Sequence, residues 1–552
     1  MVHYSGLIRA KPRWWEKVTD PAIAAKYRQE IVADDLEMVD RYWGGERRAQ
    51  LDDDAPAKFK TDKVKRWPRE PLSDAQLAYI FDELVYEASA RDPSTGSFAS
   101  LCASSVRKVH ESQSLIEPAL KEQFVRAAAM LENVPDDKKD WHPNTDEQVL
   151  DLVHPSLYPA CIGRTLFHKR SEDGGEPTLA LLTPEEYVDA RGDLSLDPDY
   201  TTSMAYQWLP TDFAVSDSGD VSALGYINNL HPIHHRALYP ALERILARFV
   251  TLFDRVLWDA ASPARPLAVD ITDQVFLWYN DIEPPEPEWD DANRAVHDAW
   301  EKAHRWPRVP DPAPFAPPSA DGRVSFTLKG RTVQAIVKLA SIHLTPEKPT
   351  YPGGSWHVEG MANERIVATG LYYYAMENVT ASRLAFRQSL WDGDDLEYEQ
   401  DDHRGYVAVY GFGRDDALSQ PIGHVVAAEG KCVAFPNVYQ HRVEPFELED
   451  KTRSGHRKIL ALFLVDPIDR VLSTSDVPPQ QEEWAMAEAE NAEMLRRMPQ
   501  ELVDMVMGHA KEGLMSREEA EEHRLKLMAE RSRFVKGHNE EVFEMKFNMC
   551  EH

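Results

Sequence analysis

Hydrophobic residues recur at helical spacing near both ends of the chain. Residues 21–43 (PAIAAKYRQEIVADDLEMVDRYW) and 114–134 (SLIEPALKEQFVRAAAMLENV) place apolar side chains three and four positions apart, the period of an amphipathic helix. Met, Leu and Ala repeat at the same spacing in 482–498 (EEWAMAEAENAEMLRRM). We therefore expect a helical N-terminal region, 1–150, and a helical C-terminal region, 471–552, whose apolar faces pack on the rest of the molecule.

Between these regions the pattern changes to that of strands. Residues 151–320 mix strand and helix patterns and include a Pro-rich segment, 283–318, which we expect to be extended. Residues 321–470 read as a β-rich core. Its three longest runs of β-branched and aromatic residues are GRTVQAIVKLASIHL (330–344), RIVATGLYYYAMENV (365–379) and GHRKILALFLVDP (455–467).

Composition narrows the class of protein. The net charge is 62 − 93 = −31, which argues against nonspecific binding to nucleic acid or to an anionic membrane. Four scattered cysteines (Cys102, Cys161, Cys432 and Cys550) indicate neither a disulfide framework nor a thiolate zinc site, and fit a reducing compartment. The N-terminus lacks the apolar segment of a signal peptide, and no apolar run approaches membrane-spanning length. We expect an intracellular protein, cytoplasmic or nuclear.

Candidate chemistry centres on His357 and Glu359, an H-x-E pattern inside the β-rich core. A strand sends residues two apart to one face, so both side chains could hold the same metal ion. Roughly three H-x-[DE] matches are expected by chance in a chain of this composition, and the alternative is a polar strand face. The other match, His538 and Glu540, lies in a charged helical stretch where residues two apart diverge.

A third ligand must come from elsewhere in the chain. His441, in FPNVYQHRVEPF, stands sixteen residues before Arg457 with a turn between them, and is preferred over His403 and His424. A polar histidine at a strand end is the simpler alternative for His441. Two His and one carboxylate on one face of an octahedron form the triad of non-heme Fe(II) oxygenases.

The order of these features resembles the Fe(II)/2-oxoglutarate-dependent dioxygenase superfamily over about residues 325–470. The likeness is to its prolyl-hydroxylase-like branch, where H-x-[DE] is followed by a tyrosine-rich strand, a distal His and a G-x-R that opens the last strand. The whole chain also resembles a large, mainly fungal family of uncharacterised proteins. The resemblance implies an α+β protein with a double-stranded β-helix, or jelly-roll, core at 321–470 and helical flanks.

The resemblance also implies a second set of residues, for 2-oxoglutarate. Arg457 would bind its distal carboxylate through a bidentate fork, since an unpaired Arg opening an apolar strand would be costly. A salt bridge to a protein carboxylate is the alternative for Arg457, and Lys458 or Lys338 could replace it as the anchor. Thr369 and Tyr373 would face inward, where Tyr373 would hydrogen-bond 2-oxoglutarate or be a core aromatic.

Matching the tyrosine-rich strand to this pattern also orients its other residues. Leu371 would face inward, and Tyr372 and Tyr374 would face the outer layer. The metal ligands would be His357, Glu359 and His441.

The expected function is that of a 2-oxoglutarate-dependent oxygenase, most simply a hydroxylase, using Fe(II), 2-oxoglutarate and O2. Its substrate would be a small molecule or a protein, and its oligomeric state is left open. Two other interpretations compete: a jelly-roll binding or scaffold protein without turnover, and a cupin-like metalloenzyme that does not use 2-oxoglutarate. The second would leave Arg457 unexplained.

Two polar stretches of the middle region fall outside this assignment. Residues 151–165 (DLVHPSLYPACIGRT) and 226–240 (YINNLHPIHHRALYP) share a loose H-P…L-Y-P echo, too short for a repeat unit. Asn228 and Asn229 could contact substrate, although such pairs usually serve turn geometry. Three histidines could bind a second metal, but a polar loop before a helix is simpler because no carboxylate accompanies them at ligand spacing: His231, His234 and His235.

Overall fold

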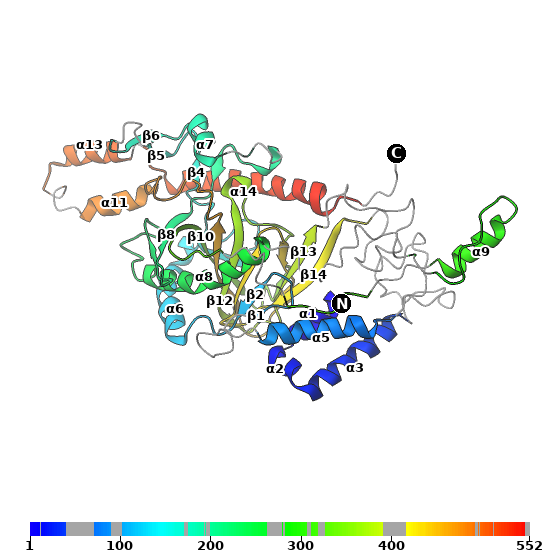
Figure 1. The fold of residues 1–552 in the computed structure, drawn as a ribbon. Helices are drawn as coiled ribbons and strands as arrows, with labels where there is room; N and C mark the ends of the chain where they lie inside the picture. Colours follow the sequence, from blue (N-terminus) through cyan, green and yellow to red (C-terminus); the bar gives the residue numbers. More distant parts are fainter. Residues whose placement is uncertain are drawn as a thin grey trace.

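A computed structural model of the chain (Figure 1) shows a mixed α/β protein built on antiparallel sheets. It describes residues 1–11, 13–39, 71–89, 102–169, 175–192, 194, 199–261, 279, 282–305, 311–317, 326–389, 416–491, 495, 497–511 and 513–546. His403 and parts of the Pro-rich segment lie outside these residues. None of the helices in the described part of the chain combines the length and apolar character needed to cross a bilayer.

The central sheet contains the long strands predicted from the sequence. Its strand order is β1-β2-β15-β12-β18-β10-β8-β9, and β3 also pairs with β10. The bounds are β1 Cys102–Ala103, β2 His110–Ser112, β3 Val149–Val153, β8 Thr211–Val215, β9 Val221–Ala223, β10 Thr332–Leu344, β12 Ile366–Glu377, β15 Cys432–Pro436 and β18 Gly455–Val465. Strands β1 and β2 and the first two residues of β3 fall in the region predicted to be helical, because strands this short show little periodicity of their own.

A smaller sheet faces the central one. It has the order β14-β13-β16, where β13 is Arg383–Ser389, β14 Ser419–Val426 and β16 Gln440–Val443, and a separate pair joins β11 (Thr350–Tyr351) to β17 (Phe446–Glu447). One apolar cluster takes Leu371 and Phe463 from the central sheet and Leu384 and Phe386 from the smaller one. The two sheets therefore pack face to face around a shared core, which we call the inter-sheet core.

Helices cover the opposite face of the central sheet. Helix α8 (Tyr239–Ala261) lies across β12 in Figure 1, and α6 (Pro118–Glu132) packs beside it. The buried side chains of β12 alternate as a strand requires. Leu371 and Tyr373 join the inter-sheet core, whereas Tyr372 and Tyr374 join the apolar cluster between the central sheet and these helices, as the family resemblance implied.

The helical flanks differ in how they meet the sheets. Helices α1 (Val2–Arg9), α2 (Trp14–Thr19), α3 (Pro21–Met38) and α5 (Asp74–Ser89) share an apolar cluster of their own. By contrast, α14 (Arg517–His538) contributes Ala520 and Leu527 to the inter-sheet core, and runs along one end of the sheets in Figure 1.

Shorter elements complete the described chain. They are β4 Ala160–Cys161, β5 Leu166–Lys169, β6 Thr178–Leu181, α7 Pro184–Arg191, β7 Tyr206–Gln207, α9 Arg294–His304, α11 Glu482–Asn491, α13 Gln500–Ala510, the 3₁₀ turns η2 Asp136–Lys138, η3 Asp199–Thr201 and η5 Ala362–Glu364, and the π-helical turn η6 Asn539–Phe543.

Candidate metal centre

The structure brings His357, Glu359 and His441 together at the edge of the smaller sheet. His357 and His441 exchange two backbone hydrogen bonds, with N···O distances of 3.2 and 3.0 Å, and their rings lie 4.5 Å apart. Oε1 of Glu359 is 3.3 Å from Nε2 of His441 and 3.8 Å from Nε2 of His357. His357 lies on an isolated bridge rather than in the regular strand expected, and this bridge places its side chain beside that of His441.

Asn437 fixes the backbone of Glu359 and escaped the sequence reasoning. Its Oδ1 accepts from the Glu359 N–H at 2.9 Å, and its Nδ2 donates to the carbonyls of Glu359 at 2.8 Å and Ile366 at 3.0 Å. The only indication of this role in the sequence is that Asn437 follows Pro436 in a turn, where Asn side chains commonly hydrogen-bond to nearby backbone groups. We treat Asn437 as a positioning residue for the carboxylate.

The three groups hold different charges. Burial disfavours the charged forms of both His357 and Glu359. The hydrogen bonds and charge interactions of the site, with contributions from His441 and the Ser355 carbonyl, together outweigh burial, so the pKa of His357 is raised and that of Glu359 is held well below its usual range. Burial and the neighbouring His357 lower the pKa of His441. The site therefore presents one carboxylate, one neutral imidazole and one imidazole that loses its proton as the pH rises.

The hydrogen bonds of the ring nitrogens decide which of them can bind a metal. Nδ1 of His357 lies 2.8 Å from the carbonyl of Ser355, so it donates a proton and leaves the Nε2 lone pair free. Nδ1 of His441 lies near the carbonyl of Tyr439 without meeting hydrogen-bond geometry, and its Nε2 faces Glu359. Both histidines thus direct Nε2 to the carboxylate, as metal ligands require.

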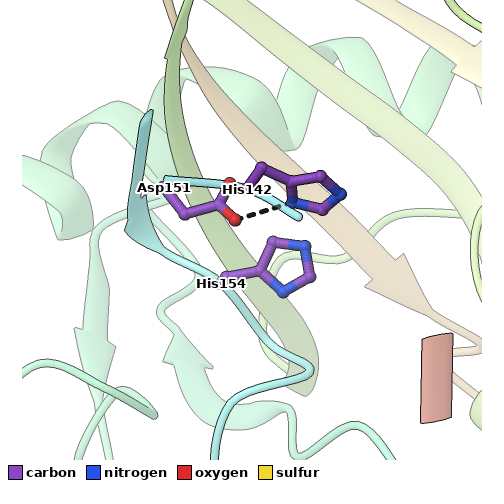
Figure 2. Close-up of side chains that lie close together, drawn as sticks. All are labelled: His142, Asp151 and His154. Atoms are coloured by element: carbon purple, nitrogen blue, oxygen red, sulfur yellow. Dashed lines mark hydrogen bonds and ion pairs between the residues drawn. The ribbon is translucent and has the colours of Figure 1, made fainter. Parts of the chain in front are cut away.

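A second cluster of ligand-type side chains contains His142, Asp151 and His154 (Figure 2). Its hydrogen bonds do not leave these side chains free to bind a metal. Nδ1 of His154 accepts from the Ser156 N–H at 3.2 Å, so the neutral ring carries its proton on Nε2. Oδ2 of Asp151 already accepts from Nδ1 of His142 at 2.7 Å and from Arg524. A metal here would compete with a guanidinium and would require the less favourable tautomer of His154.

Arg457 is buried in β18 with only 2% of its surface exposed. Its Nε and Nη1 have no hydrogen-bond partner, and no described carboxylate lies within ion-pair distance. Its guanidinium lies 4.9 Å from the centre of the Tyr373 ring, and the buried hydroxyls of Tyr373 and Thr369 also lack partners. A buried unpaired cation is costly, so this arrangement favours an anionic ligand.

The structure places the other candidate residues, Lys458, Lys338 and His424, at three different positions on the sheets. Lys458 points away from the inter-sheet core and pairs with Glu132 at 2.5 Å. Lys338 shares a strand face with Ile336, which belongs to the inter-sheet core, and so lies on the same side of the central sheet as Arg457. His424 lies on β14 outside both clusters.

The middle-region side chains that the sequence left open take no part in either cluster of ligand-type side chains. Asn228 and Asn229 bond the loop at 154–158. In the loop before α8, His231 stacks on His234, and the His231 N–H donates to Nδ1 of His235.

Comparison with known proteins gives a family and several weak structural likenesses. A family model described as "Protein of unknown function (DUF4246)" matches residues 74–488, which include both sheets and the cluster of His357, Glu359 and His441. No curated protein matches the chain. The structure of IDO from Bacillus thuringiensis is 9% identical, covers 65% of this chain and 89% of that chain, and has a TM-score of 0.23.

Two further solved structures show similar values. The Fe(II)/(alpha)ketoglutarate-dependent dioxygenase TqaL is 9% identical over 64% of this chain and 91% of that chain, with a TM-score of 0.23. A bsmA homologue from Methylobium petroleophilum PM1 is 10% identical over 52% and 87%, with a TM-score of 0.20. TM-scores this low do not establish a common fold, so function must be argued from this chain's own residues.

Proposed function

The chain belongs to the DUF4246 family, whose description assigns no function, and from its own side chains we propose an Fe(II)- and 2-oxoglutarate-dependent oxygenase. One observation carries the proposal. A facial set of two imidazoles and one carboxylate and a buried, unpaired guanidinium border the same inter-sheet core. His441 packs on Phe435 of this core, and Arg457 lies over Tyr373 of the same core.

The order in which the chain visits the two sheets supports a jelly-roll core. Strands β10, β12, β15 and β18 lie in the central sheet, while β13, β14 and β16 lie in the smaller one, so the chain passes repeatedly from sheet to sheet. The His357–His441 bridge adds the segment after β11 to the smaller sheet. Alternation between two facing antiparallel sheets is typical of a jelly roll, or double-stranded β-helix.

The side chains fit the proposed cofactor and co-substrate. Nε2 of His357, Nε2 of His441 and the Glu359 carboxylate would hold Fe(II) and leave positions for other ligands. Arg457 would bind the distal carboxylate of 2-oxoglutarate, with the hydroxyls of Tyr373 and Thr369 orienting it. These buried groups and the surrounding aromatic rings would also exclude water from the reacting atoms.

When bound, iron would activate O2 for the overall conversion of substrate, 2-oxoglutarate and O2 into hydroxylated substrate, succinate and CO2. The substrate would be a small molecule or a protein side chain. A cupin-like metalloenzyme without 2-oxoglutarate would leave Arg457 unpaired, and an inert scaffold would give no reason for three converging metal ligands.

Metal content of purified variants tests the ligand assignment. His357→Ala, Glu359→Ala and His441→Ala should each abolish stoichiometric iron binding while circular dichroism shows an intact fold. His154→Ala, from the second cluster, and His424→Ala, from β14, are matched controls that should keep the metal. Loss of iron in His154→Ala with retention in His441→Ala would move the metal to the second cluster.

A further inference from the structure

The outer face of the smaller sheet, turned away from the inter-sheet core, carries the sequence neighbours of both histidines of the candidate metal centre. His441 of β16 packs against the inter-sheet core. Since successive residues of a strand point to opposite faces, its neighbours Gln440 and Arg442 face outward. Trp356, which precedes His357, lies beside Arg442 on this outer face, with the guanidinium 4.6 Å from the centre of its ring.

Arg387 of β13 joins these two neighbouring segments. It stands opposite Gln440 in the register of β13 and β16, and its Nε donates to Oε1 of Gln440 at 2.7 Å. Its guanidinium also lies 5.0 Å from the centre of the Trp356 ring. Only 8% of Arg387 is exposed, so these contacts take the place of most of its hydration. One buried side chain therefore contacts a neighbour of each histidine.

Asn539, the residue that follows α14, completes the arrangement. Its Oδ1 accepts from Nη2 of Arg387 at 2.9 Å and from Nε2 of Gln440 at 2.7 Å. With the bond between Arg387 and Gln440, the three side chains form a closed ring of hydrogen bonds. Because arginine can only donate, both amides must turn their oxygens toward it. Each side chain of the ring is thus oriented by the other two.

The segment after Asn539 is bound to the same sheet. The hydroxyl of Ser389, at the end of β13, donates to the carbonyl of Val542 at 3.1 Å. Phe543 is 2% exposed, and the centre of its ring lies 5.3 Å from the guanidinium of Arg387. Because α14 precedes Asn539 and this bound segment follows it, the position of Asn539 is fixed on both sides.

We propose that Arg387 and Asn539 are positioning residues of the candidate metal centre. Neither belongs to its cluster of ligand-type side chains. They bind the sequence neighbours of His357 and His441 and thereby restrain the backbone from which both imidazoles project. Because metal ligands must be held within roughly 0.5 Å of their working geometry, this restraint should determine how well the two rings converge. The inference rests on the proposed function, since it takes both histidines to be metal ligands.

Arg383 offers a contrast at the other end of β13. Leu384 and Phe386 point into the inter-sheet core, so Arg383 and Arg387 both face outward. The side chain of Arg383 is 49% exposed, and its guanidinium lies 3.9 Å from the carboxylate of Glu444. Its charged group is therefore directed to an exposed ion pair, which contributes little, rather than to the ring of hydrogen bonds.

Titration of the metal-free full chain with Co(II) tests the proposal, because the visible absorption of bound cobalt reports its ligand geometry. Arg387→Lys keeps the charge but cannot reproduce the planar fork of the guanidinium. Asn539→Leu keeps a side chain of similar shape but removes the oxygen that accepts both bonds. Each should weaken cobalt affinity about tenfold to hundredfold and shift the visible absorption, while circular dichroism shows an intact fold.

Two further variants separate positioning from a general loss of stability. Asn539→Asp restores an oxygen that accepts both hydrogen bonds and should bind cobalt as the unmutated protein does. Arg383→Lys makes the same substitution as Arg387→Lys at the other end of β13 and should leave cobalt affinity unchanged. A merely structural role would lower the free energy of unfolding without changing the cobalt affinity of the folded chain.

Unchanged cobalt affinity in either Arg387→Lys or Asn539→Leu would overturn the proposal. A loss of equal size in Arg383→Lys or Asn539→Asp would also overturn it. If the unmutated protein itself binds no cobalt, the metal centre is contradicted, and the positioning role with it. The unmutated protein therefore distinguishes failure of the proposed function from failure of this inference.

Discussion

Arg457 is the residue on which the proposed use of 2-oxoglutarate depends most. It lies buried between Tyr373 and Phe446 with two guanidinium nitrogens unpartnered. Arg457→Ala would leave the distal carboxylate of 2-oxoglutarate unpaired, a loss of about 3–5 kcal/mol, or roughly a hundredfold to several-thousandfold in affinity. Arg457→Lys should recover only part of this because an ammonium cannot form the planar fork.

Calorimetry with iron or a redox-inert substitute already bound measures this affinity directly. Iron affinity itself should change little, since Arg457 is not among the proposed ligands. If Arg457→Ala binds 2-oxoglutarate as tightly as the unmutated protein, the anchor is Lys338 instead, and Lys338→Ala should then show the loss.

His357 should make metal binding depend on pH. Burial disfavours its charged form, but Glu359 and the Ser355 carbonyl together outweigh burial, so the pKa of His357 is raised above its ordinary value in the metal-free protein. A proton on Nε2 competes with the metal, so affinity should fall about tenfold per pH unit as pH drops below this raised pKa. Above the raised pKa, His357 should contribute no further dependence.

The raised pKa of His357 also makes the stability of the metal-free protein depend on pH. The raised pKa of His357 contributes stability to the metal-free protein that is fully present below the unfolded pKa of about 6.5 and is lost as pH rises through the folded value. Measuring cobalt affinity between about pH 6 and pH 8 checks whether protonation of His357 weakens metal binding. An affinity that is flat over this range would contradict the raised pKa.

At the residue scale, the H-x-E spacing predicted that His357 and Glu359 lie together, but it did not predict the residues that hold them in position. His357 and Glu359 converge although neither lies in a regular strand, whereas His538 ends α14 and stacks on Phe534, away from either cluster of ligand-type side chains in the described chain. Asn437 could not be found from the sequence, because its role depends on bringing a turn beside Glu359 across 78 positions. The ring tautomers were equally out of reach, since they depend on backbone carbonyls placed by the fold.

At the scale of elements, the contact of α8 with β12 depends on a glycine. A Cβ on Gly370 would lie 2.7 Å from two ring carbons of Phe249 and 3.0 Å from Phe253. Gly370→Ala should therefore push the helix from the sheet and lower the free energy of unfolding by about 1–3 kcal/mol. Denaturant unfolding followed by circular dichroism measures the change.

Gly508 provides the matched control within the same chain. It lies in α13, where a Cβ would meet nothing within 4 Å. Gly508→Ala should be neutral or stabilise by up to about 1 kcal/mol, because Ala is the better helix former. Equal effects of the two substitutions would show that α8 does not press on Gly370 as described.

The long strands were predicted because their apolar runs exceed what a loop carries, and they became β10, β12 and β18. The short strands β1, β2 and β3 were missed, since two to five residues give no periodic signal, and β2 and β3 also pair with strands more than a hundred positions away. Pairing of β3 with β10 brings Asp151 and Lys338 to one region of the central sheet, which no local pattern could indicate.

At the scale of the whole molecule, the C-terminal region completes the structure around the sheets. Arg524 of α14 pairs with Asp140 and Asp151, and Arg531 pairs with Glu364 at 2.5 Å while lying over the Trp208 ring. The sequence predicted that this region packs on the core from its apolar spacing. The buried arginines could not be predicted, because a charged residue on a helix is ordinarily a solvent-facing one.

The central claim is that iron and 2-oxoglutarate bind together between the two sheets. Anaerobic titration of the metal-free full chain with Fe(II) and then 2-oxoglutarate tests it before any substrate is known. A visible charge-transfer band should appear only when both are present, saturate at one equivalent of each, and be absent in His441→Ala. Stoichiometric iron binding without this band would contradict 2-oxoglutarate use, and the absence of iron binding would contradict the metal centre itself.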